Sequence, residues 1–441
     1  MTPRRWFAAR RILWALVLWS FWLGGCFGTA GLETPGANLT PGAPGVITPG
    51  VQPTLGIETQ TVPARPNLVL RVWLPRQFDI HQDNPASLLL RKRLDEFLVK
   101  NPGVSLDVRI KAESGPGGML ESLAAASAAA PLAMPDLVAL SRSTLEPAAL
   151  KGYLRSYAGL TSLMEETDWY EYAHQMSLLQ QSLFGLPFAG DALVMAFNPE
   201  VIAIPPQDWA QTLSISATLV FPASDPAAMF TQVQYLAAGG QVQDDQGRPA
   251  LDEMALLKVL QFYQQASTAG QMPFWLTQYE TDDQAWEAWQ AGQSDLNITW
   301  VSRVLQSPDR VLRGASMPTI SGQAYTVSSG WVWALSSPSR DPQREALAIR
   351  LAEFLCEPNF LGAWTQAAGY LPTRSKALDA WDAGPYADMA RTVVASAHQM
   401  PSANILAVVG PALRQAVTSV LRQQASPEEA ARSAVELFKN P

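Results

Sequence analysis

Strand-like and helix-like segments alternate early in the chain, and this alternation limits the fold more than any other feature. Residues 68–74 are apolar on both sides of an extended pattern, which is typical of a strand buried on both faces. Four further segments have the apolar pattern of a regular helix or strand. They are an amphipathic helix over 87–100, a strand over 104–110, an alanine-rich helix over 119–130 and a short strand over 136–140. The alternation predicts an α/β fold with a parallel, doubly wound sheet.

Ligands of such sheets bind beyond the carboxyl ends of the strands. The first and third expected strands are followed by Arg76 and Ser141, so both residues are candidate ligand contacts. Ser141 has a second possible role, because a serine at the end of a strand also caps the helix that follows it. That helix is expected over 146–151. Further along, a helix is expected from Pro411 to Gln424, whereas the segment after Trp209 has only a weak helical pattern.

Composition excludes several classes of partner for this chain of 441 residues. Charged residues make up 16% and the net charge is −8, with no basic block after the first residues, so nucleic acid is not an expected partner. The three histidines lack metal-ligand spacing, and neither a nucleophile-elbow motif nor a phosphate loop occurs. No metal or cofactor is therefore expected. Cys356 is predicted to be a small buried residue near a helix end.

Residues 1–25 have the order of a secretory signal peptide. Basic residues come first, then an apolar run over 12–23, then two glycines. The run is shorter than the roughly 20 residues that a membrane span needs. Leu23-Gly24-Gly25-Cys26 resembles the lipobox of bacterial lipoproteins, which implies cleavage before Cys26 and lipidation of Cys26. An uncleaved anchor helix is the alternative. Arg4-Arg5 loosely resembles a twin-arginine export signal, so the export route stays open.

Residues 26–66 are rich in proline, glycine and threonine and poor in aromatic residues. A segment of this composition buries no core and stays extended. It is predicted to be a tether between the lipidated Cys26 and the folded part of the chain.

A series of short stretches resembles family 1 extracellular solute-binding proteins of ABC importers, the maltose-binding-protein group. No stretch is specific alone, but their shared order carries the resemblance. In chain order they are 94–97, 101–104, 134–138, 183–188, 192–200, 208–209, 237–240, 295–300, 317–319, 330–336 and 369–374.

The resemblance implies a two-lobe periplasmic-binding-protein-like (type II) fold with a hinge and an interlobe cleft. Lobe 1 is expected to hold residues 67–189 plus 312–355, and lobe 2 residues 190–311 plus 356–441. It further implies a monomer outside the cytoplasm, anchored to the cell membrane through Cys26. Such a protein captures a small solute by hinge closure and delivers it to the importer's permease subunits. The short segment after Trp209 departs from the family pattern.

Tryptophan is frequent after the tether, and flat indole rings suit the apolar C–H faces of sugars, so the solute is predicted to be a sugar or oligosaccharide. Core packing is the alternative for any one ring, and it is the preferred interpretation for Trp286 and Trp289. The predicted ligand-binding residues combine indoles near strand ends with polar groups in the matching motifs. They are Trp73, Arg76, Ser141, Asp191, Trp300, Trp331, Tyr370 and Arg374. Capping of a hinge turn is an equal alternative for Asp191, and an ion pair at the cleft rim is the preferred alternative for Arg374.

Two other classes of function stay open beside solute transport. A surface hydrolase of the glycosidase type needs two carboxylates that meet in a cleft. The sequence offers only adjacent acidic pairs such as Asp282-Asp283, which are expected to be solvated loop charges or charges at helix starts. The second alternative is a sensory or interaction lipoprotein that keeps the fold without feeding a transporter. The prediction is a binding protein and not an enzyme.

Overall fold

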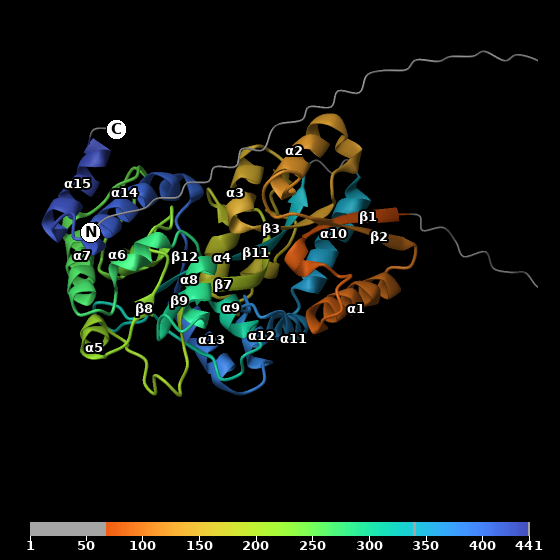
Figure 1. Cartoon of the computed structure of the whole chain (residues 1–441). Coiled ribbons are helices and arrows are strands. Elements are labelled where there is room, and N and C mark those ends of the chain that lie inside the picture. The colour runs from red at the N-terminus through yellow and green to blue at the C-terminus, as the bar shows by residue number, and fades with distance from the viewer. Residues whose placement is uncertain (1–67, 338–340, 440–441) are drawn as a thin grey trace, which may run out of the picture. The chain divides into compact units, whose positions relative to one another are not determined.

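The computed structural model describes residues 68–337 and 341–439. The predicted signal peptide, Cys26 and the tether lie outside the described residues. One mixed sheet runs through the fold in the order β2–β1–β3–β11–β7–β9–β8 (Figure 1). Its strands are β1 (Leu68–Pro75), β2 (Val104–Lys111), β3 (Leu137–Ser141), β7 (Leu186–Phe197), β8 (Leu219–Val220), β9 (Leu296–Trp300) and β11 (Thr326–Ser336).

The first three strands pair in parallel, as the sequence predicts. The prediction of a wholly parallel sheet is wrong, however, because β11 is antiparallel to both β3 and β7. Strand β11 returns from the far part of the chain and inserts beside β3, where sequence order gives no hint of it. Short strands complete the pairing. They are β4 (Leu154–Arg155), β10 (Arg313–Ala315) and β12 (Ala397–Gln399). Strands β5 (Leu178–Leu179) and β6 (Ser182–Leu183) pair only with each other, in a separate two-stranded sheet.

Helices cover the β1–β3 part of the sheet. They are α1 (Pro85–Lys100), α2 (Met119–Ala129), α3 (Arg142–Leu150), α4 (Glu171–Ser177), α10 (Pro342–Leu355), α11 (Pro358–Ala368) and α12 (Ser375–Asp379). Helix α1 begins where the Asn84 side chain accepts a hydrogen bond from the Ser87 amide, and it buries Leu90, Leu94 and Phe97. The predicted apolar stripe is thereby confirmed. Cys356 ends α10 and is fully buried, which confirms that prediction as well.

A second set of helices surrounds β8 and β9. It comprises α5 (Trp209–Ser214), α6 (Met229–Ala237), α7 (Glu253–Thr268), α8 (Asp282–Gln290), α9 (Val301–Leu305), α14 (Ala403–Leu421) and α15 (Pro427–Lys439). Helix α13 (Pro385–Ser396) instead lies beside β10, and its buried Met389 and Val393 belong to the same hydrophobic cluster as β1. The six-residue α5 agrees with the weak pattern after Trp209. Two helices begin earlier in the chain than predicted. Helix α3 begins at Arg142, before the predicted residue 146, and α14 begins at Ala403, before the predicted Pro411. Burial of Ile405 and Val409 extends the apolar stripe of α14 across that proline.

The hydrophobic interior divides between the two parts of the sheet, and this division makes the fold two-lobed. Leu70, Val72 and Leu94 belong to one cluster, and Phe221, Tyr263 and Val417 belong to another. Residues 356–441, predicted to lie in lobe 2, divide between the clusters. Leu361 and Trp364 of α11 pack in the first cluster, whereas α14 packs in the second. The lobe boundaries given above, including the assignment of residues 356–441 to lobe 2, stay predictions.

Among the described residues, α14 is the one helix long and apolar enough to cross a membrane. Half of that helix is buried, and its apolar side packs in the second cluster. A core helix meets the same criteria of length and hydropathy, and this packing accounts for its composition.

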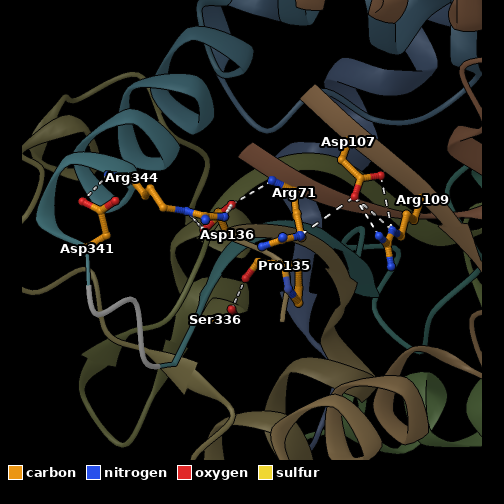
Figure 2. A network of polar contacts seen from close by, with 8 residues as sticks. All are labelled: Arg71, Asp107, Arg109, Pro135, Asp136, Ser336, Asp341 and Arg344. Atoms are coloured by element: carbon orange, nitrogen blue, oxygen red, sulfur yellow. Dashed lines mark hydrogen bonds and ion pairs between the residues drawn. The ribbon is translucent and has the colours of Figure 1, made fainter. Parts of the chain in front are cut away.

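A polar network ties the elements of the first lobe together at the amino end of β3 (Figure 2). Asp136 accepts hydrogen bonds from the Arg71 amide at 2.7 Å and from Arg344 Nη2 at 2.7 Å. It thereby joins β1 to α10. The Ser336 hydroxyl donates to the Pro135 carbonyl and adds β11 to the network. These contacts lie at the opposite strand ends from the carboxyl-end loops, so they brace the sheet without occupying its ligand-binding edge.

The long strands β7 and β11 pass through both lobes and lie side by side at two glycines. Gly190 pairs with Gly330 across the two strands. A Cβ atom on Gly330 would lie 2.2 Å from the Ala189 carbonyl oxygen, and one on Gly190 would lie 2.3 Å from the Tyr172 hydroxyl. Only residues without a side chain allow this spacing. The structure accordingly contains a two-glycine crossing between the lobes.

We expect Gly330→Ala to lower the free energy of unfolding by at least the ~1–3 kcal/mol typical of overpacking, because the clashing atom belongs to the backbone. Urea unfolding followed by circular dichroism measures the change. A loss below about 0.5 kcal/mol would contradict the close approach of β7 and β11.

Candidate functional site

A cavity of about 570 Å³ opens where β7, β9 and β11 meet. It lies within the size range of small-molecule sites. Four separate stretches contribute to the wall, namely β7, the segment from α8 to just after α9, β11, and the segment after β12. The lining residues are Asp191, Asp282, Trp286, Gln290, Trp300, Ser302, Arg303, Gln306, Ser307, Pro308, Ser329, Trp331 and Met400. We call this the cleft cavity.

Three indoles, of Trp286, Trp300 and Trp331, line the cleft cavity. The Trp331 ring makes edge-to-face contacts with two other aromatic rings. Its centroid lies 5.4 Å from that of Phe78 and 4.9 Å from that of Tyr370. Within the described residues, the Trp331 indole N–H has no hydrogen-bond partner. The wall therefore offers flat apolar surfaces, whereas the unpaired Trp331 N–H is itself buried.

Asp191 supplies a carboxylate at the point where β7 crosses between lobes. The Ser302 amide donates to its Oδ1 at 3.0 Å and the Ser302 hydroxyl to its Oδ2 at 2.5 Å. The side chain is only 6% exposed. Burial raises the pKa of Asp191 to about 7, although the hydrogen bonds from Ser302 and Ala192 oppose the rise. This carboxyl group therefore changes protonation near neutral pH.

This pKa predicts a pH-dependent contribution to stability. In the unfolded chain Asp191 ionises near 4, so its stabilising contribution is complete below that pH and is lost as pH rises through about 7. Wild type should therefore lose up to ~4 kcal/mol relative to Asp191→Asn between pH 4 and pH 8, since each pKa unit is worth about 1.4 kcal/mol. Urea unfolding of both proteins across this range is the measurement. A pH-independent difference would refute the shifted pKa.

The acidic pair at 282–283 forms ion pairs with Arg303. Arg303 Nε donates to Asp282 at 2.8 Å, and Arg303 Nη2 donates to Asp283. Burial raises the pKa of Asp282, and the charge of Arg303 opposes that rise. Asp282 and Arg303 both line the cleft cavity, because α8 starts beside the turn from β9 into α9. Both aspartates stand at the start of α8, as one of the two predicted roles requires, and Asp282 is in addition a paired residue of the cavity wall.

The structure brings three of the eight predicted ligand residues to the cleft cavity, namely Asp191, Trp300 and Trp331. Tyr370 is 7% exposed and backs the Trp331 ring from outside the lining. Burial raises the pKa of the Tyr370 hydroxyl, which stays neutral.

Three more predicted residues lie outside the lining of the cleft cavity. Trp73 is 3% exposed, with the Lys111 ammonium 4.8 Å from its ring centroid. Arg76 is exposed in the short helix after β1. Ser141 is buried and its hydroxyl donates to Thr144 Oγ1 at 3.1 Å, a local contact at the start of α3.

Arg374 forms the ion pair that was the preferred alternative to ligand contact, but it lies buried and not at a rim. It is 1% exposed, and its guanidinium donates to Asp168 Oδ1 at 2.7 Å, to Asp168 Oδ2 at 3.0 Å and to the Cys356 carbonyl at 3.1 Å. Glu166 accepts a further bond, and the Trp169 ring lies 4.6 Å from the guanidinium carbon. The cation is therefore enclosed by the protein's own groups and joins the segment before α4 to the one before α12.

Sequence reasoning missed much of the cleft wall. Ser302 and Arg303 of α9 and Gln306 at its end follow Trp300 closely, so the rule that strand ends carry ligand contacts would have found them. Trp286 was interpreted as a packing residue. It is 7% exposed and packed at 5.1 Å against Trp289, yet it also lines the cavity. Met400 carried no signal, because only the pairing of β12 with β11 brings it near.

In the described part of the chain, no group of three or more His, Cys, Asp and Glu residues is placed to hold a metal ion. The cleft cavity instead combines indole faces, a buried carboxyl group, an arginine paired with two carboxylates, and amide and hydroxyl groups. Two lobes, crossing strands and a cavity at the crossing define a two-lobe binding protein.

The chain belongs to the family of bacterial extracellular solute-binding proteins, whose model matches residues 92–391. No curated protein matches the chain. Solved structures with the same fold include the sugar-binding protein MalE from Xanthomonas citri, with a TM-score of 0.68 and 16% identity over 84% of this chain and 98% of that one. MalE from Listeria monocytogenes in complex with maltose has a TM-score of 0.68 and 15% identity over 85% and 97%. Maltose-bound MalE3 from T. maritima has a TM-score of 0.63 and 17% identity over 84% and 99%.

Proposed function

We propose that the chain is the solute receptor of an ABC importer and that it captures a sugar or oligosaccharide in the cleft cavity. The convergence of Trp286, Trp300 and Trp331 on one cavity carries the proposal. Indole faces cover the apolar C–H surfaces of a sugar ring. The side chains of Gln290, Gln306 and Arg303 are of the types that bind hydroxyl groups. Relatives of this fold have been solved with maltose bound, which supports the same class of solute.

Capture in this proposal needs no chemical step. The lobes close about the two-glycine crossing, and the closed form presents its solute to the permease subunits. The lipid-anchored location belongs to the same proposal, since it depends on Cys26 and the tether. The protein acts as a monomer and as a binding protein, not as an enzyme. The carboxylates that line the cleft cavity, Asp191 and Asp282, are engaged by Ser302 and Arg303 respectively.

Isothermal titration calorimetry of the full chain against maltose, maltotriose, cellobiose, xylobiose and chitobiose tests the proposal. We expect dissociation constants in the micromolar range or below for one of these classes, with the sugar recovered unaltered. Firm binding of an amino acid or peptide, with none of any sugar, would refute the carbohydrate assignment. Cleavage of a bound oligosaccharide would refute the assignment as a binding protein.

Mass spectrometry of the N-terminus tests the membrane anchor. The proposal predicts a chain that begins at a lipid-modified Cys26. An unmodified cysteine, with Met1 still attached, would contradict it.

A further inference from the structure

A second cavity of about 550 Å³ lies beside β10, which pairs with the end of β7. None of its lining residues belongs to the cleft cavity. Its walls come from the end of β7, the loop at 205–207, the segment 313–317 and helix α13. Its volume nearly equals that of the cleft cavity and is ample for a small molecule.

The floor of this β10 cavity is apolar and tightly packed. Phe197, Met317 and Met389 line it and are each less than a tenth exposed. A Cβ atom on Gly314 would lie 2.2 Å from Met389 Sδ, so the thioether rests directly on the backbone of β10. Pro205 and Pro206 add apolar surface to the wall. An apolar body that covers this floor would gain roughly 25 cal/mol for each Å² removed from water.

Arg313 brings one positively charged group to the same cavity, in a fixed orientation. Its Nη1 donates to the carbonyls of Arg310, Val311 and Leu312 at 2.7, 3.0 and 2.9 Å. These bonds fix one corner of the guanidinium. Within the described residues, neither Nε nor Nη2 has a hydrogen-bond or ion-pair partner. The Nε–Nη2 edge is the fork that binds a carboxylate through two parallel hydrogen bonds.

The remaining charge on the cavity wall does not neutralise this arginine. Asp388 also lines the cavity, but its Oδ1 accepts from Arg391 at 3.1 Å and its side chain is 75% exposed. In the described part of the chain, no carboxylate lies within 4.0 Å of the Arg313 guanidinium. The β10 cavity therefore pairs a dry apolar floor with an unpaired, oriented cation.

We propose that the β10 cavity is a second binding site, for a small apolar molecule that carries one carboxylate group. The apolar body lies on Phe197, Met317 and Met389, and the carboxylate accepts from Nε and Nη2 of Arg313. A neutral sugar, the solute proposed for the cleft cavity, has no group that matches this fork. The second site therefore does not depend on the function proposed for the first.

Titration calorimetry of the full chain with 2-naphthoate tests this site, and 2-naphthylmethanol is the matched uncharged probe. We expect saturable binding of 2-naphthoate and at least tenfold weaker binding of the alcohol. Arg313→Met keeps an apolar side chain but lacks the guanidinium fork. It should therefore bind 2-naphthoate at least tenfold more weakly than wild type and bind 2-naphthylmethanol with unchanged affinity. Arg313→Met also loses the three bonds to backbone carbonyls, so a lower melting temperature is expected, and a single cooperative thermal transition shows that the variant is still folded.

Trp300→Ala is the control for the cleft cavity and should bind 2-naphthoate as wild type does. Three results would each overturn the proposal. They are no binding of 2-naphthoate by wild type, equal binding by Arg313→Met, and loss of binding in Trp300→Ala. The sugar affinity of Arg313→Met should be unchanged, so failure of this site and failure of the cleft proposal give different results.

Discussion

Arg374→Met should lower the free energy of unfolding by about 3–5 kcal/mol, the range seen when one partner of a buried ion pair is removed. Asp168 is 6% exposed and depends on Arg374 for two hydrogen bonds. Burial alone would raise the pKa of Asp168, but the Arg374 hydrogen bonds and charge lower it overall. Without the arginine, a buried carboxylate is left unpaired or must take up a proton. Urea unfolding followed by tryptophan fluorescence measures the loss.

Two matched variants sharpen this test. Arg109→Met removes an arginine that is 47% exposed and paired with Asp107, so it should cost less than about 1 kcal/mol. Adding Asp168→Asn to Arg374→Met removes the stranded charge and should recover part of the stability. If Arg374→Met is no more costly than Arg109→Met, the enclosed cation does not hold the segments before α4 and α12 together.

Trp300→Ala should weaken binding of the preferred sugar by about 30-fold or more, since truncating an aromatic anchor costs about 2 kcal/mol or more. Trp300 ends β9 and lines the cleft cavity. Trp300→Phe keeps a flat ring and should retain most of the affinity. Phe274→Ala removes an aromatic ring that is 62% exposed and lies outside the lining, so it should bind as wild type does. Equal sugar affinities for Trp300→Ala and wild type would show that the Trp300 indole does not contact the bound sugar.

The β1–β3 region was predictable because its residues interact with near neighbours in sequence. Alternation in 68–74 and the apolar stripe of α1 both report burial against adjacent elements. Strand β11 was not predictable in the same way, because its partners β3 and β7 lie more than 120 residues earlier. The antiparallel insertion and the pairing of Gly190 with Gly330 depend on that long-range contact.

The candidate site also combines residues that local sequence predicts with residues whose role depends on long-range contacts. Trp300 and Asp191 stand at a strand end and at a crossing, places where a fold of this kind presents side chains to a ligand. Arg374 has the composition of a ligand contact, yet the carboxylates that enclose it come from residues 166 and 168, some 200 positions away. Charge type alone does not distinguish a ligand-binding arginine from a buried ion pair. Only the fold decides between the two.

A crystal structure of the chain with its tightest-binding sugar tests the central claim most directly. The account predicts a sugar ring against the indoles of Trp300 and Trp331, with the ligand intact. A sugar bound elsewhere with the cleft cavity unfilled, or a cleft filled by the protein's own side chains, would contradict the account.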